Sequence, residues 1–164
     1  MAITIDQYSQ ELTTVRAEGN SKLAPNVDGG RMRIKHFNHN TNDDGVSGDA
    51  DGQNIALCKI PKGARILEVF LAFEAMGGSS VLDLGLAGTD GSGFIDEADT
   101  VADDDDLFAA ALSVVSAGEA VVADTIAQNY AYETDKEVYL VATVETDAWD
   151  ADKDLTGHVV YVVD

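Results

Sequence analysis

Apolar and polar residues alternate along much of this chain with a period of two, which is the period of a half-buried β-strand. The alternation is clearest from 54 to 88, where turns at Pro61-Lys62-Gly63 and at Gly77-Gly78-Ser79-Ser80 separate three predicted strands. Two of these strands would each turn one face inward, made by Leu67, Val69, Leu71 and Phe73 and then by Leu82, Leu84 and Leu86. The pattern predicts an all-β protein built as an antiparallel β-sandwich.

The C-terminal part of the chain repeats this pattern. The segment 137–145 has an inward face made by Val138, Leu140, Ala142 and Val144. The segment 158–163 is apolar on both faces, which predicts a central strand or an oligomer interface. Between the two halves, a short helix over 107–117 and a hairpin over 112–122 are both compatible with the sequence.

The first thirty residues differ from the rest of the chain because they show no sustained hydrophobic period. We interpret residues 1–30 as an extended N-terminal arm and residues 31–164 as the β-sandwich domain. Since an arm rarely orders alone, it should lie on a neighbouring subunit or on the outside of its own domain.

Charge is distributed unevenly along the chain, which carries 30 acidic and 10 basic residues and a net charge of −20. Residues 1–65 hold eight acids and eight bases, whereas residues 66–164 hold 22 acids and only two lysines. Such an acidic body repels phosphate backbones, so nucleic acid is excluded as a direct partner. The acid load is typical of proteins from saline environments. No apolar run approaches 18 residues, so no membrane partner is predicted.

One strand, 31–39, is locally basic. Its alternation places Arg31, Arg33, Lys35 and Phe37 on one face and Met32, Ile34, His36 and Asn38 on the other. Such a strand is suited to meet an acidic partner surface. An edge strand that uses charge against unwanted pairing is equally compatible with the sequence.

Three features could bind a ligand. The loop after the basic strand has the alternate oxygen spacing of a calcium loop at Asn40, Asn42, Asp44 and Asp51, with a solvated hairpin loop as the alternative. His36 and His39 fall on opposite strand faces, which favours surface and core roles over a shared metal site. The lone Trp149 lies among aspartates and could stack on a sugar, with packing on the rim of the sandwich as its alternative.

No catalytic residues are predicted. The sequence lacks a Gly-x-Ser-x-Gly elbow, a His-Glu-x-x-His motif and a P-loop. Cys58, the single cysteine, falls within an apolar strand and is expected to be buried and inert. We therefore expect a protein that is not an enzyme and has no cofactor, apart from calcium at the loop described above.

The order of strands and turns resembles small virion structural proteins of tailed bacterial and archaeal viruses. Five segments carry the resemblance: Arg31–Phe37, Ile60–Leu67, Val81–Gly85, Gly93–Asp99 and Gly157–Tyr161. The resemblance implies a jelly-roll-like sandwich that sits on or between capsid subunits, often as a homotrimer. It carries over no catalytic residues.

From the residues and the resemblance together we expect a virion structural protein that binds the capsid exterior and decorates or cements the shell. Its partners would be the major capsid protein and further copies of itself. The expected contact residues are Ile3, Ile5, Tyr8, Arg16, Arg31, Arg33, Lys35 and Phe37. The alternative is a lectin-like carbohydrate-binding module on the virion surface, or a head-fibre or neck module for host attachment, in which Trp149 contacts the ligand.

Overall fold

The computed structural model describes residues 7–8, 31–42, 48–91, 93–95, 106–122 and 133–163. Within these ranges the chain forms β-strands and no helix. The strands are β1 (Gln7–Tyr8), β2 (Arg31–Asn40), β3 (Asn54–Ile60), β4 (Ala64–Phe73), β5 (Val81–Gly88), β6 (Ala109–Ser113), β7 (Gly118–Val122), β8 (Val138–Glu145) and β9 (Asp154–Val163).

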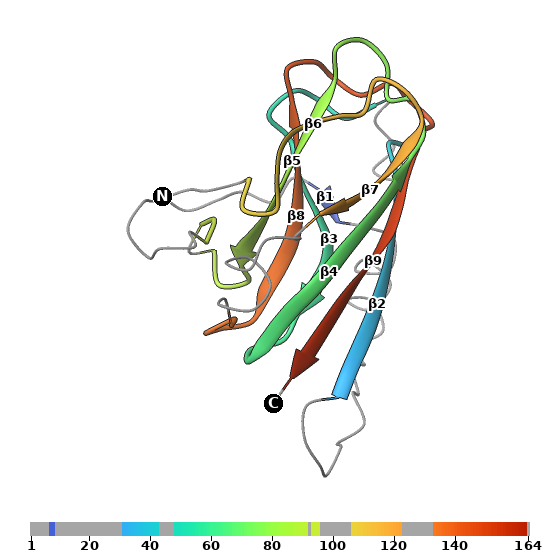
Figure 1. The fold of residues 1–164 in the computed structure, drawn as a ribbon. Helices are drawn as coiled ribbons and strands as arrows, with labels where there is room; N and C mark the ends of the chain where they lie inside the picture. Colours follow the sequence, from blue (N-terminus) through green and yellow to red (C-terminus); the bar gives the residue numbers. More distant parts are fainter. Residues whose placement is uncertain are drawn as a thin grey trace.

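The strands form two sheets packed face to face, as Figure 1 shows. One sheet has the order β2-β9-β4-β7, and the other has the order β1-β3-β8-β5-β6. From β2 to β9, strands that follow one another in sequence fall in opposite sheets for most of the chain, which is the arrangement of an eight-stranded jelly roll. The predicted β-sandwich of jelly-roll type is therefore confirmed.

The described part of the N-terminal arm is short. β1 adds to the edge of the second sheet, where Gln7 pairs with Ile55 and Tyr8 pairs with Ala56 in parallel. The rest of the arm lies outside the described residues, so the division between arm and domain stays a prediction.

The core forms because the inner faces of both sheets are apolar. β5 contributes Leu82, Leu84 and Leu86, and β8 contributes the four residues whose period predicted an inward face, all of them fully buried. These side chains pack into one continuous cluster with the inward residues of β4 and β9. The period of two therefore identified the core faces of these strands correctly.

β4 departs from the predicted parity because it contains a bulge. Its pairing with β9 shifts register between Ile66 and Glu68. An extra residue at a bulge exchanges the two faces of the strand beyond it. Ile66 is therefore buried before the bulge and Val69 is buried after it, while Leu67 is only half-buried and does not belong to the inward face that we predicted.

The segment around Val114 forms neither the helix nor the hairpin that the sequence allowed. β6 pairs with β5 in one sheet, and β7 pairs with β4 in the other. The chain therefore crosses from one sheet to the other between these strands. Buried Val114 fixes the crossing, because its carbonyl accepts a hydrogen bond from the Met76 N–H at 2.9 Å.

The outer faces of the two sheets differ. On the five-stranded sheet a second buried cluster covers the outside, formed by Ala56, Ala87, Tyr139 and Val141 with Phe94 packed against them. Phe94 reaches this cluster because 93–95 folds back along β5, where Phe94 bridges to Ala87. The four-stranded sheet instead leaves large apolar side chains exposed on its outer face.

β9 holds the four-stranded sheet together because it pairs with β2 on one side and β4 on the other. This confirms the central position that its apolar character predicted. At Gly157 both β2 and β4 lie very close to the β9 backbone. A Cβ atom there would overlap the carbonyl oxygen of Phe70 and lie 2.7 Å from Cζ of Phe37. A side chain at this position would therefore push strands apart.

We expect Gly157→Ala to lower the free energy of unfolding by about 1–3 kcal/mol, the usual cost of overpacking a core. The matched control is Gly118→Ala, where the new Cβ would meet the Phe73 ring at an ordinary 3.4 Å. Urea denaturation of both variants measures the difference. Equal midpoints for the two variants would contradict the close packing of β9 described here.

Candidate interaction surface

β2 pairs with β9 without a register shift, from Arg31 opposite Val163 to Asn40 opposite Asp154. Alternate side chains of β2 therefore stay on the same face along the whole strand. On the outside, the pairings of β2, β9, β4 and β7 align side chains in rows across the sheet. The rows are Met32-Val162-Arg65, then Ile34-Val160-Glu68, then His36-His158-Phe70-Val121. We call these ten residues the apolar face.

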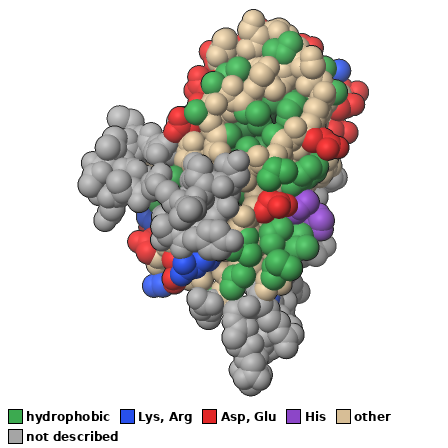
Figure 2. All heavy atoms as spheres, viewed as in Figure 1, with side chains coloured by type: hydrophobic (Ala, Val, Ile, Leu, Met, Phe, Trp, Pro, Cys, Tyr) green, Lys and Arg blue, Asp and Glu red, His purple; other side chains and the backbone are tan. Residues whose placement is uncertain are grey.

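The apolar face exposes large hydrophobic side chains to solvent. Met32 is 66% exposed, and Ile34 and Val121 are each 56% exposed. Figure 2, viewed toward the four-stranded sheet, shows hydrophobic side chains gathered beside a histidine on this side of the molecule. A contiguous exposed patch of this kind, rather than scattered single residues, is typical of a surface that contacts another molecule.

The apolar face carries few net charges for so acidic a protein. Among its residues only Glu68 is acidic and only Arg65 is a permanent cation. Glu68 lies 3.6 Å from His158, whose ring stacks on Phe70 at 5.3 Å between centroids. Arg65 pairs with Glu133 at 3.5 Å. This surface can therefore approach another protein without the repulsion that the rest of the molecule would exert.

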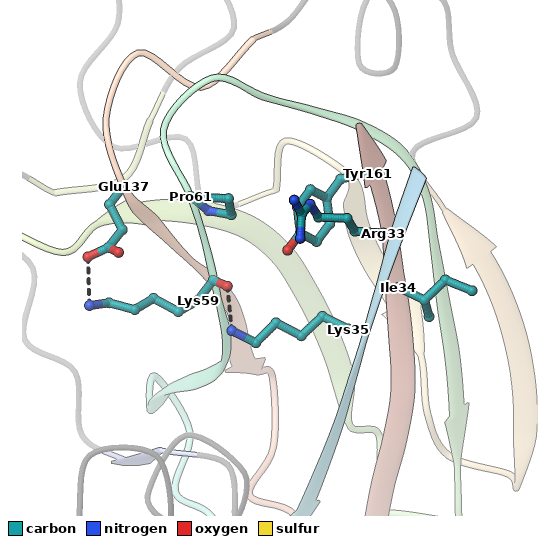
Figure 3. A pocket seen from close by; sticks show the side chains of 7 residues that line it. All are labelled: Arg33, Ile34, Lys35, Lys59, Pro61, Glu137 and Tyr161. Carbon is teal, nitrogen blue, oxygen red and sulfur yellow. Dashed lines mark hydrogen bonds and ion pairs between the residues drawn. The ribbon is translucent and has the colours of Figure 1, made fainter. Parts of the chain in front are cut away.

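The inner side of β2 carries three of the eight predicted contact residues, Arg33, Lys35 and Phe37. Phe37 is only 1% exposed and packs in the core, so its assignment to a contact surface is wrong: the inward face of the strand becomes core at this point. Arg33 and Lys35 lie on the same face of β2 as Phe37 but nearer the N-terminal end of the strand. There they line a pocket of about 390 Å³ with Ile34, Lys59, Pro61, Glu137 and Tyr161. We call this the basic pocket (Figure 3).

The remaining predicted contacts are described only in part. The backbones of Tyr8 and Arg31 pair with Ala56 and Val163, respectively. Ile3, Ile5 and Arg16 lie outside the described residues, and their roles stay predictions.

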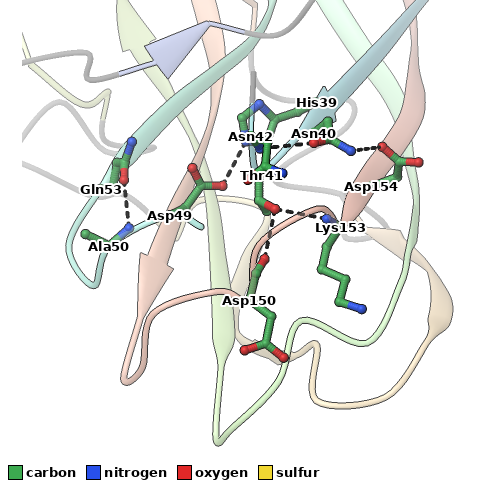
Figure 4. A network of polar contacts seen from close by, with 10 residues as sticks. All are labelled: His39, Asn40, Thr41, Asn42, Asp49, Ala50, Gln53, Asp150, Lys153 and Asp154. Atoms are coloured by element: carbon green, nitrogen blue, oxygen red, sulfur yellow. Dashed lines mark hydrogen bonds and ion pairs between the residues drawn. The ribbon is translucent and has the colours of Figure 1, made fainter. Parts of the chain in front are cut away.

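The loop region proposed for calcium contains a network of polar contacts (Figure 4). Buried His39 and buried Asp49 are joined through Nε2 and Oδ2 at 2.8 Å. The Thr41 hydroxyl donates to the Asp150 carbonyl at 2.8 Å and accepts from the Lys153 N–H at 2.9 Å. These contacts fasten the end of β2 to the loop before β9.

Of the described calcium candidates, one side chain forms hydrogen bonds within this network and two are exposed to solvent. The Asn40 amide donates to Asp154 at 2.8 Å, and its oxygen accepts from the Asn42 N–H at 3.0 Å. The Asn42 and Asp51 side chains are exposed, and Asp44 lies outside the described residues. In the described ranges no three His, Cys, Asp or Glu side chains are placed to hold a metal ion. Calcium binding by this loop stays a prediction.

Trp149 does not form a ligand contact. It is 2% exposed and packs in the core cluster, while its N–H on the main chain donates to the Asp49 carbonyl at 2.8 Å. A ring enclosed in this way cannot stack on a sugar. The prediction of a sugar contact is wrong because the loops around Trp149 fold over it, which the sequence of the tryptophan segment alone does not reveal.

The cysteine and the two histidines considered as ligands differ in burial. Cys58 is buried, as predicted. His36 is exposed and His39 is buried, so the two fall on opposite faces as their spacing predicted. In the part of the chain that the structure describes, no helix has the length and apolar character of a membrane span.

Two solved structures share this fold. A chain in the capsid of Ralstonia phage GP4 matches 98% of this chain and 99% of its own length, with a TM-score of 0.66 and 16% identity. A chain in the cyanophage Pam1 capsid asymmetric unit matches 89% of this chain and 96% of its own, with a TM-score of 0.60 and 18% identity. No protein-family model and no curated protein matches the sequence. At these identities the likeness shows a common fold.

We expect Asp49→Ala to lower the free energy of unfolding by about 1–3 kcal/mol, because it leaves the buried His39 ring without its partner. The control is Asp51→Ala, which removes an exposed carboxylate two residues away and should change stability by less than about 0.5 kcal/mol. Thermal or urea unfolding measures both. If both variants matched the wild type, the His39–Asp49 contact would have no structural role.

Proposed function

We propose that this chain is a non-enzymatic structural protein of a tailed-virus particle that binds the exterior of the capsid and decorates or cements the shell. The observation that carries the proposal is the fold shared with chains of two phage capsids over nearly their whole length. Because each match covers almost all of both chains, the likeness involves the entire jelly roll and not a common substructure alone.

The apolar face is the surface best suited to contact the shell. Burying an exposed aliphatic side chain of this size contributes about 1.5–3 kcal/mol. Met32, Ile34 and Val121 could together supply the central apolar part of an interface, with polar residues around it. A subunit that binds only the assembled shell stabilises it by mass action, which is the physical meaning of cementing.

The charge distribution favours this orientation. The net charge of −20 arises entirely from residues 66–164, whereas β2 and the chain before it are balanced. Placing the side with β2 against the shell puts a segment of balanced charge at the contact, and salt screens the repulsion among the acidic residues of 66–164. We also propose a homotrimer, since closed symmetric assemblies would let several copies share one set of neighbouring shell subunits.

The competing carbohydrate-binding function has lost the residue on which it was based, since Trp149 is buried. A head-fibre or neck location would use the same fold at a different place in the particle. The apolar face favours the shell, because an extended near-neutral sheet surface fits a broad contact better than a narrow attachment point.

We expect Val121→Asp, on the apolar face and outside the basic pocket, to weaken binding to capsids of the encoding virus by about tenfold or more, since a loss of about 1.4 kcal/mol is already tenfold. The matched control is Val115→Asp, because Val115 is also exposed, at 41%, but lies between β6 and β7 away from the apolar face. Co-sedimentation of purified protein with capsids lacking it measures both. Equal loss in the two variants would argue against the apolar face as the contact.

We also expect deletion of residues 1–30 to reduce retention on capsids, because this predicted arm would add contacts beyond the sandwich. The control replaces residues 20–24 by glycine and serine, since it keeps the length of the arm, its four predicted contact residues and the pairing of β1 with β3. The same sedimentation assay in increasing salt measures retention. Undiminished binding by the longer deletion would remove the arm from the proposal.

A further inference from the structure

The basic pocket gathers three of the ten basic residues in a chain of 30 acids. It lies where the edge strand β2 faces the end of β3, and the Lys35 ammonium spans the gap to donate to the Lys59 carbonyl at 2.9 Å. The Lys59 ammonium reaches the Glu137 carboxylate at 2.6 Å. Among the described residues that line the pocket, Glu137 is the only acidic one, so this described lining carries three positive charges against one negative charge.

Of the three cations that line the pocket, Arg33 has the fewest polar contacts with the described residues. Neither a hydrogen bond nor an ion pair joins its guanidinium to any side chain in the described ranges, and Figure 3 shows it beside Tyr161. Burial raises the pKa of Tyr161, and the nearby Arg33 charge lowers it in part. The phenol therefore stays neutral and can donate a hydrogen bond, while the guanidinium keeps several N–H groups for another acceptor.

These groups match a carboxylate. A guanidinium binds a carboxylate through two parallel hydrogen bonds, and a lysine with only one donor in use can add a third. Pro61 and Tyr161 form the less polar walls, which strengthen such contacts by excluding water. The volume of about 390 Å³ admits one or two side chains of an extended segment rather than a folded element.

The chemistry of the occupant follows from the charge of the whole protein. A nucleic acid or an anionic membrane carries many charges, so the net charge of −20 would repel it before any one group reached the pocket. A peptide with one or two acidic residues meets much weaker repulsion. We infer that the basic pocket binds an acidic peptide segment of the shell protein, with Arg33 as its main carboxylate ligand; the identity of this partner rests on the proposed function.

The competing explanation is protection of an edge. Charges that point inward from an edge strand prevent it from pairing with other chains, and Arg33 and Lys35 lie on such a strand. That role predicts aggregation when the charges are removed and predicts no specific site for an acidic peptide. The two explanations therefore differ in what a binding measurement shows.

The test is a titration of the full chain with a fluorescent peptide Gly-Asp-Gly-Glu-Gly, with Gly-Asn-Gly-Gln-Gly as the neutral peptide. Arg33→Gln should weaken binding of the acidic peptide by roughly tenfold, the scale of losing a bidentate charged contact. Arg33→Lys should restore part of the affinity. Arg65→Gln makes the same charge change on the apolar face and should bind like the wild type. Thermal unfolding verifies that each variant is folded.

Several results would overturn the inference. These are no binding of the acidic peptide at millimolar concentration, equal binding of the neutral peptide, equal loss in Arg33→Gln and Arg65→Gln, and aggregation of Arg33→Gln without loss of affinity. Sedimentation with capsids separates this inference from the proposed function. If the wild type binds capsids and Arg33→Gln binds them equally well, the pocket inference is refuted and the proposed function stands. If the wild type binds the acidic peptide but does not bind capsids, the proposed function is refuted and the peptide site stands.

Discussion

The pairing of β9 with both β2 and β4 is the interaction on which the rest of the structure depends. It sets the register of the four-stranded sheet, and the register decides which side chains of β2 face outward and which face inward. The close approach at Gly157 leaves little freedom for the strands to slide, because Phe37 lies directly across it. A shift of one residue would bury Met32 and Ile34 and expose Phe37.

That register gives the protein two different surfaces within one edge strand. The outer surface is apolar and nearly neutral, and the inner end of the same strand opens into a pocket with excess positive charge. Burial of apolar area supplies affinity without much direction, whereas charge pairing supplies register and orientation. The proposed role, addition to a repeating lattice in one position, would use both contributions. The remaining acidic surface limits association elsewhere.

The sequence predicted the features that depend on local alternation. The inward faces of β5 and β8, the central place of β9, and the burial of Cys58 all follow from hydrophobic period and strand composition. The errors came from long-range packing. The bulge after Ile66 shifts the parity of β4, and the loops that enclose Trp149 come from separate parts of the chain. Phe37 could have shown which face of β2 is buried. A large aromatic residue on the same face as Arg33 and Lys35 indicates that this face turns toward the core.

The most direct test of the central claim is an image reconstruction of the virus particle in which we propose that this protein is a structural component. Our account predicts the jelly roll on the outside of the shell, with the apolar face against the shell subunits and the five-stranded sheet toward solvent. Density for the protein at the neck or in a fibre would contradict the account. So would a shell position in which the four-stranded sheet faces solvent.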